Sequence, residues 1–437
     1  MTVSASPRPP SPERGTRESR PLGREEIEAL VEALIEEARR ETRRRRRTYW
    51  AVAALVTFVG VGVLTLLDGG AGSQTASPAV SAHSNAATLA ATSRIAFVRG
   101  DLGRPCRPVG RCDHGLYLVK SDGTGLRRLT RNATLGAGAD PVWSPDGRKL
   151  VFVKRPERTG ACGPAGRCND EVYVINADGT GLRRLTRNSV DDSNPVWSPD
   201  GGKIALVRVR DNQTANIYVM NADGSGQQRL TPNLRRRPWV ELAWSPDWKK
   251  IAFVASAGYR GAADIFVMNA DGSGLRNVTN TVTTSFDFAW SPNGRRIAYL
   301  DYEGLHGLSA STPLYVVNAD GTGKRRLTGP LMVDLGSPSW SLDGRTIAFT
   351  GRGGDIYTVH ADGTGLHKLT HGPGWDVGAE WSPDGRHIAF VGSRDDPYPA
   401  HPATDLFVMN ANGSAQRNLT HTPDVSEFGP SWAPAPG

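Results

Sequence analysis

The chain has 437 residues, with 52 lysines and arginines against 44 aspartates and glutamates, so its formal net charge is +8. Hydrophobic residues make up 38% of the chain and charged residues 22%, which excludes a wholly disordered protein. The 50 glycines and 30 prolines follow no period of three, which excludes collagen and favours an all-β protein with many tight turns.

The first 47 residues fall into two segments of different character. Residues 1–23 are rich in Pro, Ser and Arg and predict a disordered tail. Residues 24–47 predict an amphipathic helix, because their apolar residues recur with the spacing of one helix face. These apolar residues are Ile27, Leu30, Val31, Leu34 and Ile35.

A charge-free segment follows at residues 48–67, directly after the five consecutive arginines of residues 43–47. A helix of this length crosses the ~30 Å hydrocarbon layer, so we predict a single transmembrane helix with a cytoplasmic N-terminus. A cleaved signal peptide is the alternative, but its apolar core is shorter and nearer the N-terminus.

The predicted membrane span determines where the two segments beside it in the sequence are expected to lie. The helix at 24–47 then lies beside the membrane, where it either rests against anionic lipid headgroups or serves as a docking or dimerising helix. Residues 68–93 are rich in Ser, Ala and Gly and predict a flexible linker. Residues 94–437 are therefore expected outside the cytoplasm.

From residue 94 onward one unit recurs. Its first marker reads Trp-Ser-Pro-Asp-Gly or a variant, at intervals of 41 to 54 residues, and uses seven of the 11 tryptophans. Its second marker, Asn-Ala-Asp-Gly or a close variant, also occurs seven times. The repeated tryptophans are Trp143, Trp197, Trp244, Trp290, Trp340, Trp381 and Trp432.

Each unit predicts four short strands separated by Asp-Gly turns. In one unit these are a strand ending at Trp244, the runs 251–254 and 265–268, and a strand of the Arg-Arg-Leu-Thr type. Seven such units predict a seven-bladed β-propeller. Because the unit starting at Arg94 lacks its own Trp strand, we expect the C-terminal segment with Trp432 to close the first blade.

These markers resemble the PD-type, WD-like repeats of TolB-like propellers, over about residues 94–437. The resemblance implies an extracytoplasmic protein-binding propeller of the cell envelope. The chain departs from TolB in two ways: an anchor and a linker replace the α/β domain that precedes the TolB propeller, and there is one extra blade.

The titratable and sulfur-bearing residues predict little chemistry. The aspartates of the repeated turns stand singly before a turn residue, so we interpret them as turn formers and predict no metal site. We found no Gly-x-Ser-x-Gly nucleophile motif, and the histidines occupy unrelated positions of the repeat, so we predict no catalytic residues and no cofactor.

The four cysteines form two Cys-x5-Cys pairs in consecutive blades, which predicts disulfides Cys106–Cys112 and Cys162–Cys168 outside the cytoplasm. A four-cysteine zinc site is the alternative, although structural zinc prefers closer spacing.

Recognition is expected on the connections that vary between blades. The turns carrying the two markers share one face of the ring, whereas the variable connections share the other. Trp, Tyr and Arg dominate interface energetics, so our candidate partner contacts come mainly from these residue types. They are Arg235, Arg236, Arg237, Trp239, Tyr259, Arg260, Trp375, Asp376, Arg394 and Tyr398.

We therefore predict a membrane-anchored, non-enzymatic propeller that binds an envelope protein or a cell-wall component, with no nucleic-acid partner. One alternative is a propeller enzyme, a lyase or hydrolase, with its site in the central channel. Another is a transmembrane signalling receptor in which residues 1–47 pass on the bound state.

Overall fold

The computed structural model describes residues 93–435, apart from 101–114, 131–139, 156–168, 210–213, 233, 236–240, 257–261, 282, 303–311, 330–337, 352, 373, 394–403 and 423–424. The predicted tail, amphipathic helix, transmembrane helix and nearly all of the linker lie outside these residues. Within them, no helix has the length and apolar character that a membrane crossing requires.

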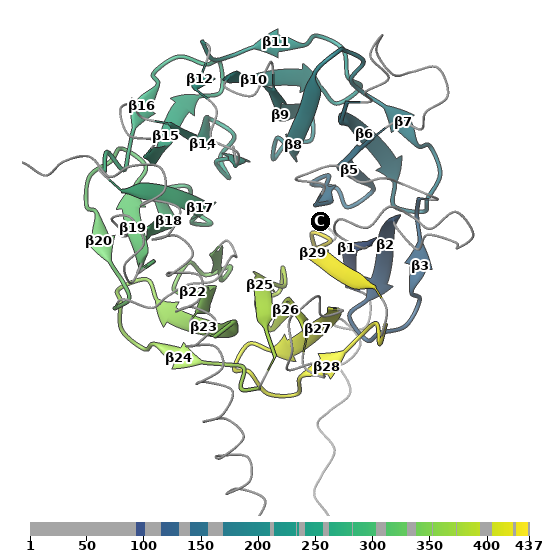
Figure 1. The fold of residues 1–437 in the computed structure, drawn as a ribbon, viewed down its shortest axis with the longest axis vertical. Coiled ribbons are helices and arrows are strands. Elements are labelled where there is room, and N and C mark those ends of the chain that lie inside the picture. The colour runs from purple at the N-terminus through teal and green to yellow at the C-terminus, as the bar shows by residue number, and fades with distance from the viewer. Residues whose placement is uncertain are drawn as a thin grey trace, which may run out of the picture. The chain divides into compact units, whose positions relative to one another are not determined.

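Over the described residues the chain forms an all-β propeller of seven antiparallel sheets arranged in a ring (Figure 1). The innermost strand of each blade ends at the repeated tryptophan. These strands are β4 (Val142–Trp143), β8 (Asp191–Trp197), β13 (Leu242–Trp244), β17 (Thr284–Trp290), β21 (Ser339–Trp340), β25 (Asp376–Trp381) and β29 (Ser426–Trp432).

The two middle strands of each blade are longer and almost wholly buried. The second strands are β1 (Arg94–Gly100), β5 (Lys149–Lys154), β9 (Lys203–Val209), β14 (Lys250–Ser256), β18 (Arg296–Tyr302), β22 (Thr346–Gly351) and β26 (His387–Gly392). The third strands are β2 (Gly115–Lys120), β6 (Glu171–Asn176), β10 (Thr214–Asn221), β15 (Ala263–Asn269), β19 (Leu314–Asn318), β23 (Asp355–His360) and β27 (Asp405–Asn410).

The outermost strands are the shortest. They are β3 (Arg127–Arg128), β7 (Arg183–Arg184), β11 (Gln228–Arg229), β16 (Arg276–Asn277), β20 (Arg325–Arg326), β24 (His367–Lys368) and β28 (Arg417–Asn418), and β12 (Leu234–Arg235) adds a further short pairing to β10. We number the blades from 1 (β4–β7) through 2 (β8–β11), 3 (β13–β16), 4 (β17–β20), 5 (β21–β24) and 6 (β25–β28) to 7 (β29 with β1–β3).

The two ends of the propeller meet in blade 7, as the sequence predicts. Strand β29 pairs antiparallel with β1, and Trp432 lies opposite Ile95 in that ladder. The indole of Trp432 donates a hydrogen bond to the carbonyl of Glu380 in blade 6, at 3.1 Å. On the other side, the indole of Trp143 in blade 1 donates to the carbonyl of Ser431, at 3.0 Å. The closing strand is therefore joined to both neighbouring blades.

The hydrophobic core lies between the blades, since each sheet is apolar on both faces. In β14, Ile251 and Phe253 belong to the cluster shared with blade 2, whereas Ala252 and Val254 belong to the cluster shared with blade 4. The small side chain of Ala252 allows Phe288 and Trp290 of blade 4 to pack into the same cluster. Side chains that alternate along one strand thus pack against the blades on both sides of it.

The first marker forms a tight turn that the Asp side chain fixes. In blade 1 the hydroxyl of Ser144 donates to Asp146 at 2.6 Å, and the amide of Arg148 donates to the same carboxylate oxygen at 3.0 Å. Gly147 follows with φ of 65°, the left-handed region that glycine adopts without strain. These contacts confirm that the repeated aspartates are turn formers.

The outermost strands are shorter than the sequence predicts. Regular pairing in blade 1 ends at Arg184. Leu185 still donates to the carbonyl of Val172, but the amide of Val172 donates to the hydroxyl of Thr186, at 3.0 Å. The same amide-to-threonine bond recurs in all seven blades. A threonine hydroxyl therefore takes the place of one more step of the ladder.

Candidate functional site

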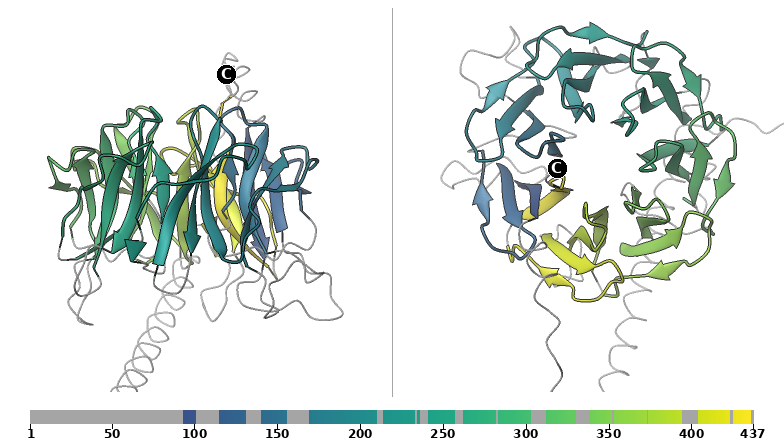
Figure 2. Two further views of the ribbon diagram at one scale, coloured as in Figure 1. Left: turned by 90° about the horizontal axis from the view of Figure 1, so that it is seen from above. Right: turned by 180° about the vertical axis from the view of Figure 1, so that it is seen from behind.

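The strands run between two faces of the ring, which Figure 2 shows from the side. We call the face with the Ser-Pro-Asp-Gly and Asn-Ala-Asp-Gly turns the turn face. We call the opposite face, where the second strand connects to the third and the fourth to the next blade, the loop face.

Two predicted contact residues are fully described, Trp375 and Asp376, which lie next to each other at the start of β25 on the loop face. The backbone of Arg235 is described in β12, but its side chain is not. The remaining candidates lie outside the described residues, as do both cysteine pairs. These candidates are Arg236, Arg237, Trp239, Tyr259, Arg260, Arg394 and Tyr398.

Trp375 is an exposed aromatic residue on a firmly held backbone. Its side chain is 47% exposed. Its amide donates to the hydroxyl of Ser393 at 3.0 Å, and the amide of Ser393 donates back to its carbonyl at 2.9 Å. It also packs so closely on Gly354 of blade 5 that a Cβ there would lie 3.0 Å from the Trp375 Cα. This indole is held between two blades and is open to a partner.

Asp376 lies in a different environment, since it is only 2% exposed. Its carboxylate occupies the space beside Gly392, and its amide donates to the carbonyl of Gly354. Nearby, Lys368 and Asp355 form an ion pair at 2.7 Å, and this hydrogen bond raises the pKa of Lys368. Asp376 is therefore buried beside the exposed Trp375, and its role as a partner contact stays a prediction.

Sequence reasoning missed a set of buried acidic residues at the loop-face ends of the strands. Most have a cationic partner: Asp192 accepts two bonds from Arg208, at 2.7 and 2.9 Å, and Glu171 lies 2.6 Å from Arg184. Two spacings in the sequence would have identified these acidic residues. Asp192 and Glu427 precede the repeated tryptophan by five residues, and Glu171 precedes the outer-strand threonine by fifteen. These side chains fix the strand ends from which the variable connections leave.

The most connected of these carboxylates is Glu427 in the closing strand. It accepts hydrogen bonds from Arg99 at 2.9 Å, Thr422 at 2.7 Å and Thr420 at 2.8 Å. The two threonine hydroxyls also lie 3.0 Å from Asp405. Burial raises the pKa of Glu427 to about 7, against the hydrogen bonds and the Arg99 charge, which lower it.

A second pair of carboxyl groups belongs to the inner strands. Glu380 precedes Trp381 in β25, and its Oε2 is buried without a hydrogen-bond donor among the described residues. Burial, with a smaller contribution from the charge of Asp140, raises its pKa to about 8. Asp140 precedes β4 and is exposed as a residue, but its carboxylate fills the space that a Cβ at Gly429 would take, and reduced solvation there raises its pKa. Glu380 can therefore hold a proton at neutral pH.

The described residues contain no cluster of three or more His, Cys, Asp or Glu that could hold a metal ion. Most of the buried carboxylates on the loop face are instead paired with arginine, lysine or threonine side chains.

Comparison with known proteins agrees with this architecture. Residues 265–435 match the family described as the TolB beta propeller domain. The TolB homolog of Chlorobium luteolum is 36% identical over 127 residues, which cover 22% of this chain and 29% of that protein. An uncharacterized peptidase of Bacillus subtilis, YuxL, is 37% identical over 67 residues, which cover 15% of this chain and 9% of that protein.

Among solved structures, a puromycin-hydrolyzing peptidase of Mycobacterium tuberculosis superposes with a TM-score of 0.55 at 13% identity, over 76% of this chain and 54% of that chain. This likeness concerns the fold alone. The matched stretches span less than a third of the length of these two curated relatives. With the seven-bladed ring and its repeated markers, these findings show that the described part of the chain, between residues 93 and 435, is a TolB-like β-propeller.

Proposed function

We propose that the propeller is a binding module of the cell envelope that recognises an envelope protein or a cell-wall component through its loop face. The observation that carries the proposal is Trp375, an exposed indole held by two blades at the edge of the variable connections. Aromatic residues on a rigid frame bind with little loss of conformational entropy, and for this reason they are frequent hot spots. The similarity to proteins named TolB supports an envelope setting.

The proposal includes a location. The uncharged segment at residues 48–67 follows a run of arginines, which supports a single membrane anchor with a cytoplasmic N-terminus. Protease treatment of intact spheroplasts tests this arrangement. The proposal expects digestion of the propeller and protection of an N-terminal epitope, and protection of the propeller would contradict it.

Capture of partners by the full chain tests the binding role. The tagged chain is expressed in its own host, cross-linked and purified from solubilised membranes, alongside Trp375→Ala and Leu342→Ala. Leu342 is the matched control because it is exposed, at 62%, but lies in a Ser-Leu-Asp-Gly turn on the opposite face.

The proposal expects at least one envelope component whose recovery falls about tenfold or more with Trp375→Ala and stays unchanged with Leu342→Ala. Equal recovery from both variants, with unchanged thermal stability of each, would exclude Trp375 as a contact.

An enzyme acting at the inner strands is the second candidate, and the Glu380 and Asp140 pair is the observation that favours it. Two carboxyl groups with raised pKa values are a common arrangement for general acid and base chemistry. A turnover screen of the full chain against peptide and glycoside substrates, repeated with Glu380→Gln, tests this candidate. Activity that disappears in the variant would support it over the binding module.

A further inference from the structure

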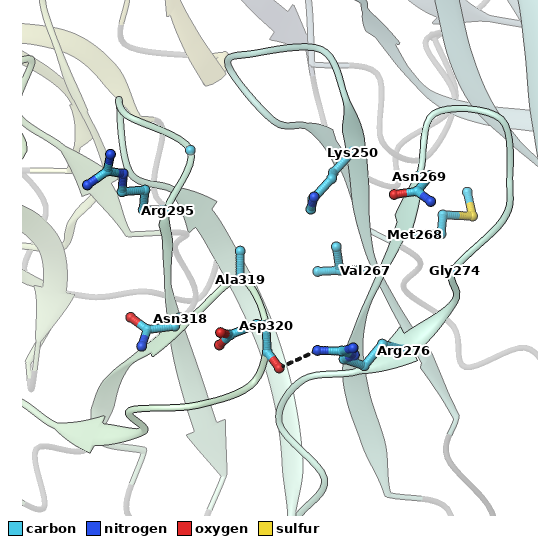
Figure 3. A pocket seen from close by; sticks show the side chains of 11 residues that line it. Lys250, Val267, Met268, Asn269, Gly274, Arg276, Arg295, Asn318, Ala319 and Asp320 are labelled. Carbon is cyan, nitrogen blue, oxygen red and sulfur yellow. Dashed lines mark hydrogen bonds between the residues drawn. The ribbon is translucent and has the colours of Figure 1, made fainter.

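The junction between blades 3 and 4 contains a cavity of about 650 Å³ on the turn face (Figure 3). Its wall combines three cationic side chains with one carboxylate, two amides and a small apolar floor. The cationic residues are Lys250, Arg276 and Arg295; the polar ones are Asp320, Asn269 and Asn318; and Val267, Met268 and Ala319 are the apolar ones.

Lys250 differs from the arginines at its repeat position in blades 7 and 4. In blade 7 the guanidinium of Arg94 lies 5.1 Å from the ring centre of Trp143 and donates to the carbonyl of Gly147 at 3.0 Å. In blade 4 Arg296 lies 5.2 Å from the ring centre of Trp340. The ammonium of Lys250, at the same repeat position, donates no hydrogen bond to any described residue. Figure 3 shows it directed into the space between the blades.

The other cations leave donors available. Arg276 donates through Nη1 to the backbone carbonyl of Asp320 at 2.9 Å, a contact with the next blade that Arg183 also makes, to the carbonyl of Asp223. The side chain of Arg295, at the rim, makes no hydrogen bond or ion pair with the described residues. Lys250 and Arg276 thus line the cavity from blade 3, and Arg295 stands at its rim on the side of blade 4.

The carboxylate and amides of the wall are already engaged. Asp320 accepts from the amide and the hydroxyl of Thr322, at 2.9 and 2.6 Å, and these bonds lower its pKa. The amide nitrogens of Asn269 and Asn318 each donate to a turn hydroxyl at 3.0 Å. Asp320 is thus not paired with Lys250 or Arg295, and the lining keeps an excess of positive charge.

We propose that this junction is a binding site for a small hydrophilic ligand that carries a carboxylate or phosphate group. A cavity of several hundred Å³ suits a ligand of one or two sugar rings, and Lys and Arg donors form charge-assisted hydrogen bonds to such oxyanions. The site lies on the turn face and does not depend on the partner proposed for the loop face.

Calorimetric titration of the purified full chain with glucose 6-phosphate, glucuronate and glucose tests the site at low ionic strength. The expected result is saturable binding of at least one of the two anions, at least tenfold tighter than that of neutral glucose and weakened by added salt. Comparing the affinity of glucose 6-phosphate with that of glucuronate shows whether the site prefers a phosphate or a carboxylate. Absence of binding by both anions, or equal binding of glucose, would overturn the proposal.

Charge-removing variants locate the binding. Lys250→Gln and Arg295→Gln are each expected to weaken the anion affinity about tenfold or more. The matched controls are Lys203→Gln, at the position of Lys250 in blade 2, and Arg386→Gln, at the position of Arg295 in blade 6. Both controls should bind as the unmodified chain does. A loss as large in the controls would mean that general positive charge, not this cavity, attracts the anions.

Discussion

The two faces of the ring use polar side chains in opposite ways. On the turn face the same hydrogen bonds recur from blade to blade, as in the pairs Ser144 with Asp146 and Ser382 with Asp384, and the charged groups are exposed. On the loop face the carboxylates of four ion pairs, Glu171, Asp192, Asp355 and Glu427, are buried, and their partners differ between blades. Repetition therefore builds the scaffold, whereas the individual networks shape the surface proposed for recognition.

The closing strand should respond most strongly to substitution. Trp432→Ala removes a buried indole that packs against β1 and bonds to blade 6, so we expect the free energy of unfolding to fall by about 3–5 kcal/mol. Urea denaturation of the full chain measures the loss. The control is Trp248→Ala on the turn face, where the indole is 53% exposed, with an expected change within about 0.5 kcal/mol. Similar losses in both variants would contradict the assigned closure.

The buried ion pair of the loop face should come next. Arg99→Met leaves Glu427 buried without its cation, and we expect a loss of about 3 kcal/mol at pH 8. Because the pKa of Glu427 is already raised to about 7, the carboxyl becomes neutral at lower pH and the loss should shrink by pH 5.5. Arg155→Met breaks an ion pair whose arginine is 46% exposed and should cost less than about 1 kcal/mol. A pH-independent loss in Arg99→Met would rule out this role of Glu427.

A smaller effect is expected where threonine completes an outer strand. Thr370→Val removes the acceptor of the buried Ile356 amide and should lower the free energy of unfolding by about 2 kcal/mol. Thr364, in an exposed turn, is the matched control: Thr364→Val should change stability by less than about 0.5 kcal/mol, since water replaces its bond to Asp362. Thermal unfolding measures the melting temperature of both variants. Equal shifts would contradict the structural role assigned to the Thr370 hydroxyl.

The inner carboxyl pair should give the smallest change, and one of opposite sign. The folded pKa of Glu380 lies at about 8, above its ordinary value of 4.5, so between these pH values the folded chain keeps a proton that the unfolded chain has lost. Stability should therefore decline as pH rises through this range.

Glu380→Gln should remove that decline and add about 1–2 kcal/mol at pH 8. Asp362→Asn is the control, because its pKa is lowered by Thr364 and it should not alter the slope between pH 5 and 8. An unchanged slope in Glu380→Gln would show that this carboxyl is ionised in the folded chain.

Much of the fold was predictable from the sequence because the same four-strand pattern recurs in seven units. The Asp-Gly turns, the strands around Ile251 and Ile265, and the pairing of Trp432 with Ile95 are all confirmed. The length of the outer strands was not predictable from strand propensity, since a threonine side chain replaces the ladder there.

The candidate site was harder to predict. Residue type selected both Trp375 and Asp376 as candidate contacts, but it could not tell that the first is exposed and the second buried. The loop-face carboxylates come from strand ends far apart in the sequence, as with Arg99 and Glu427, which only the closed ring brings together. The cavity at Lys250 depends on a difference between blades that shows only once the repeat positions are superposed.

Site-specific photo-cross-linking in the native host tests the central claim, recognition by the loop face, most directly. A photoreactive residue replaces Trp375 in one full-length chain and Leu342 in another, on opposite faces of the same ring. Our account predicts a discrete cross-linked envelope partner from position 375 and none from position 342. The same partner captured from position 342 alone would contradict it.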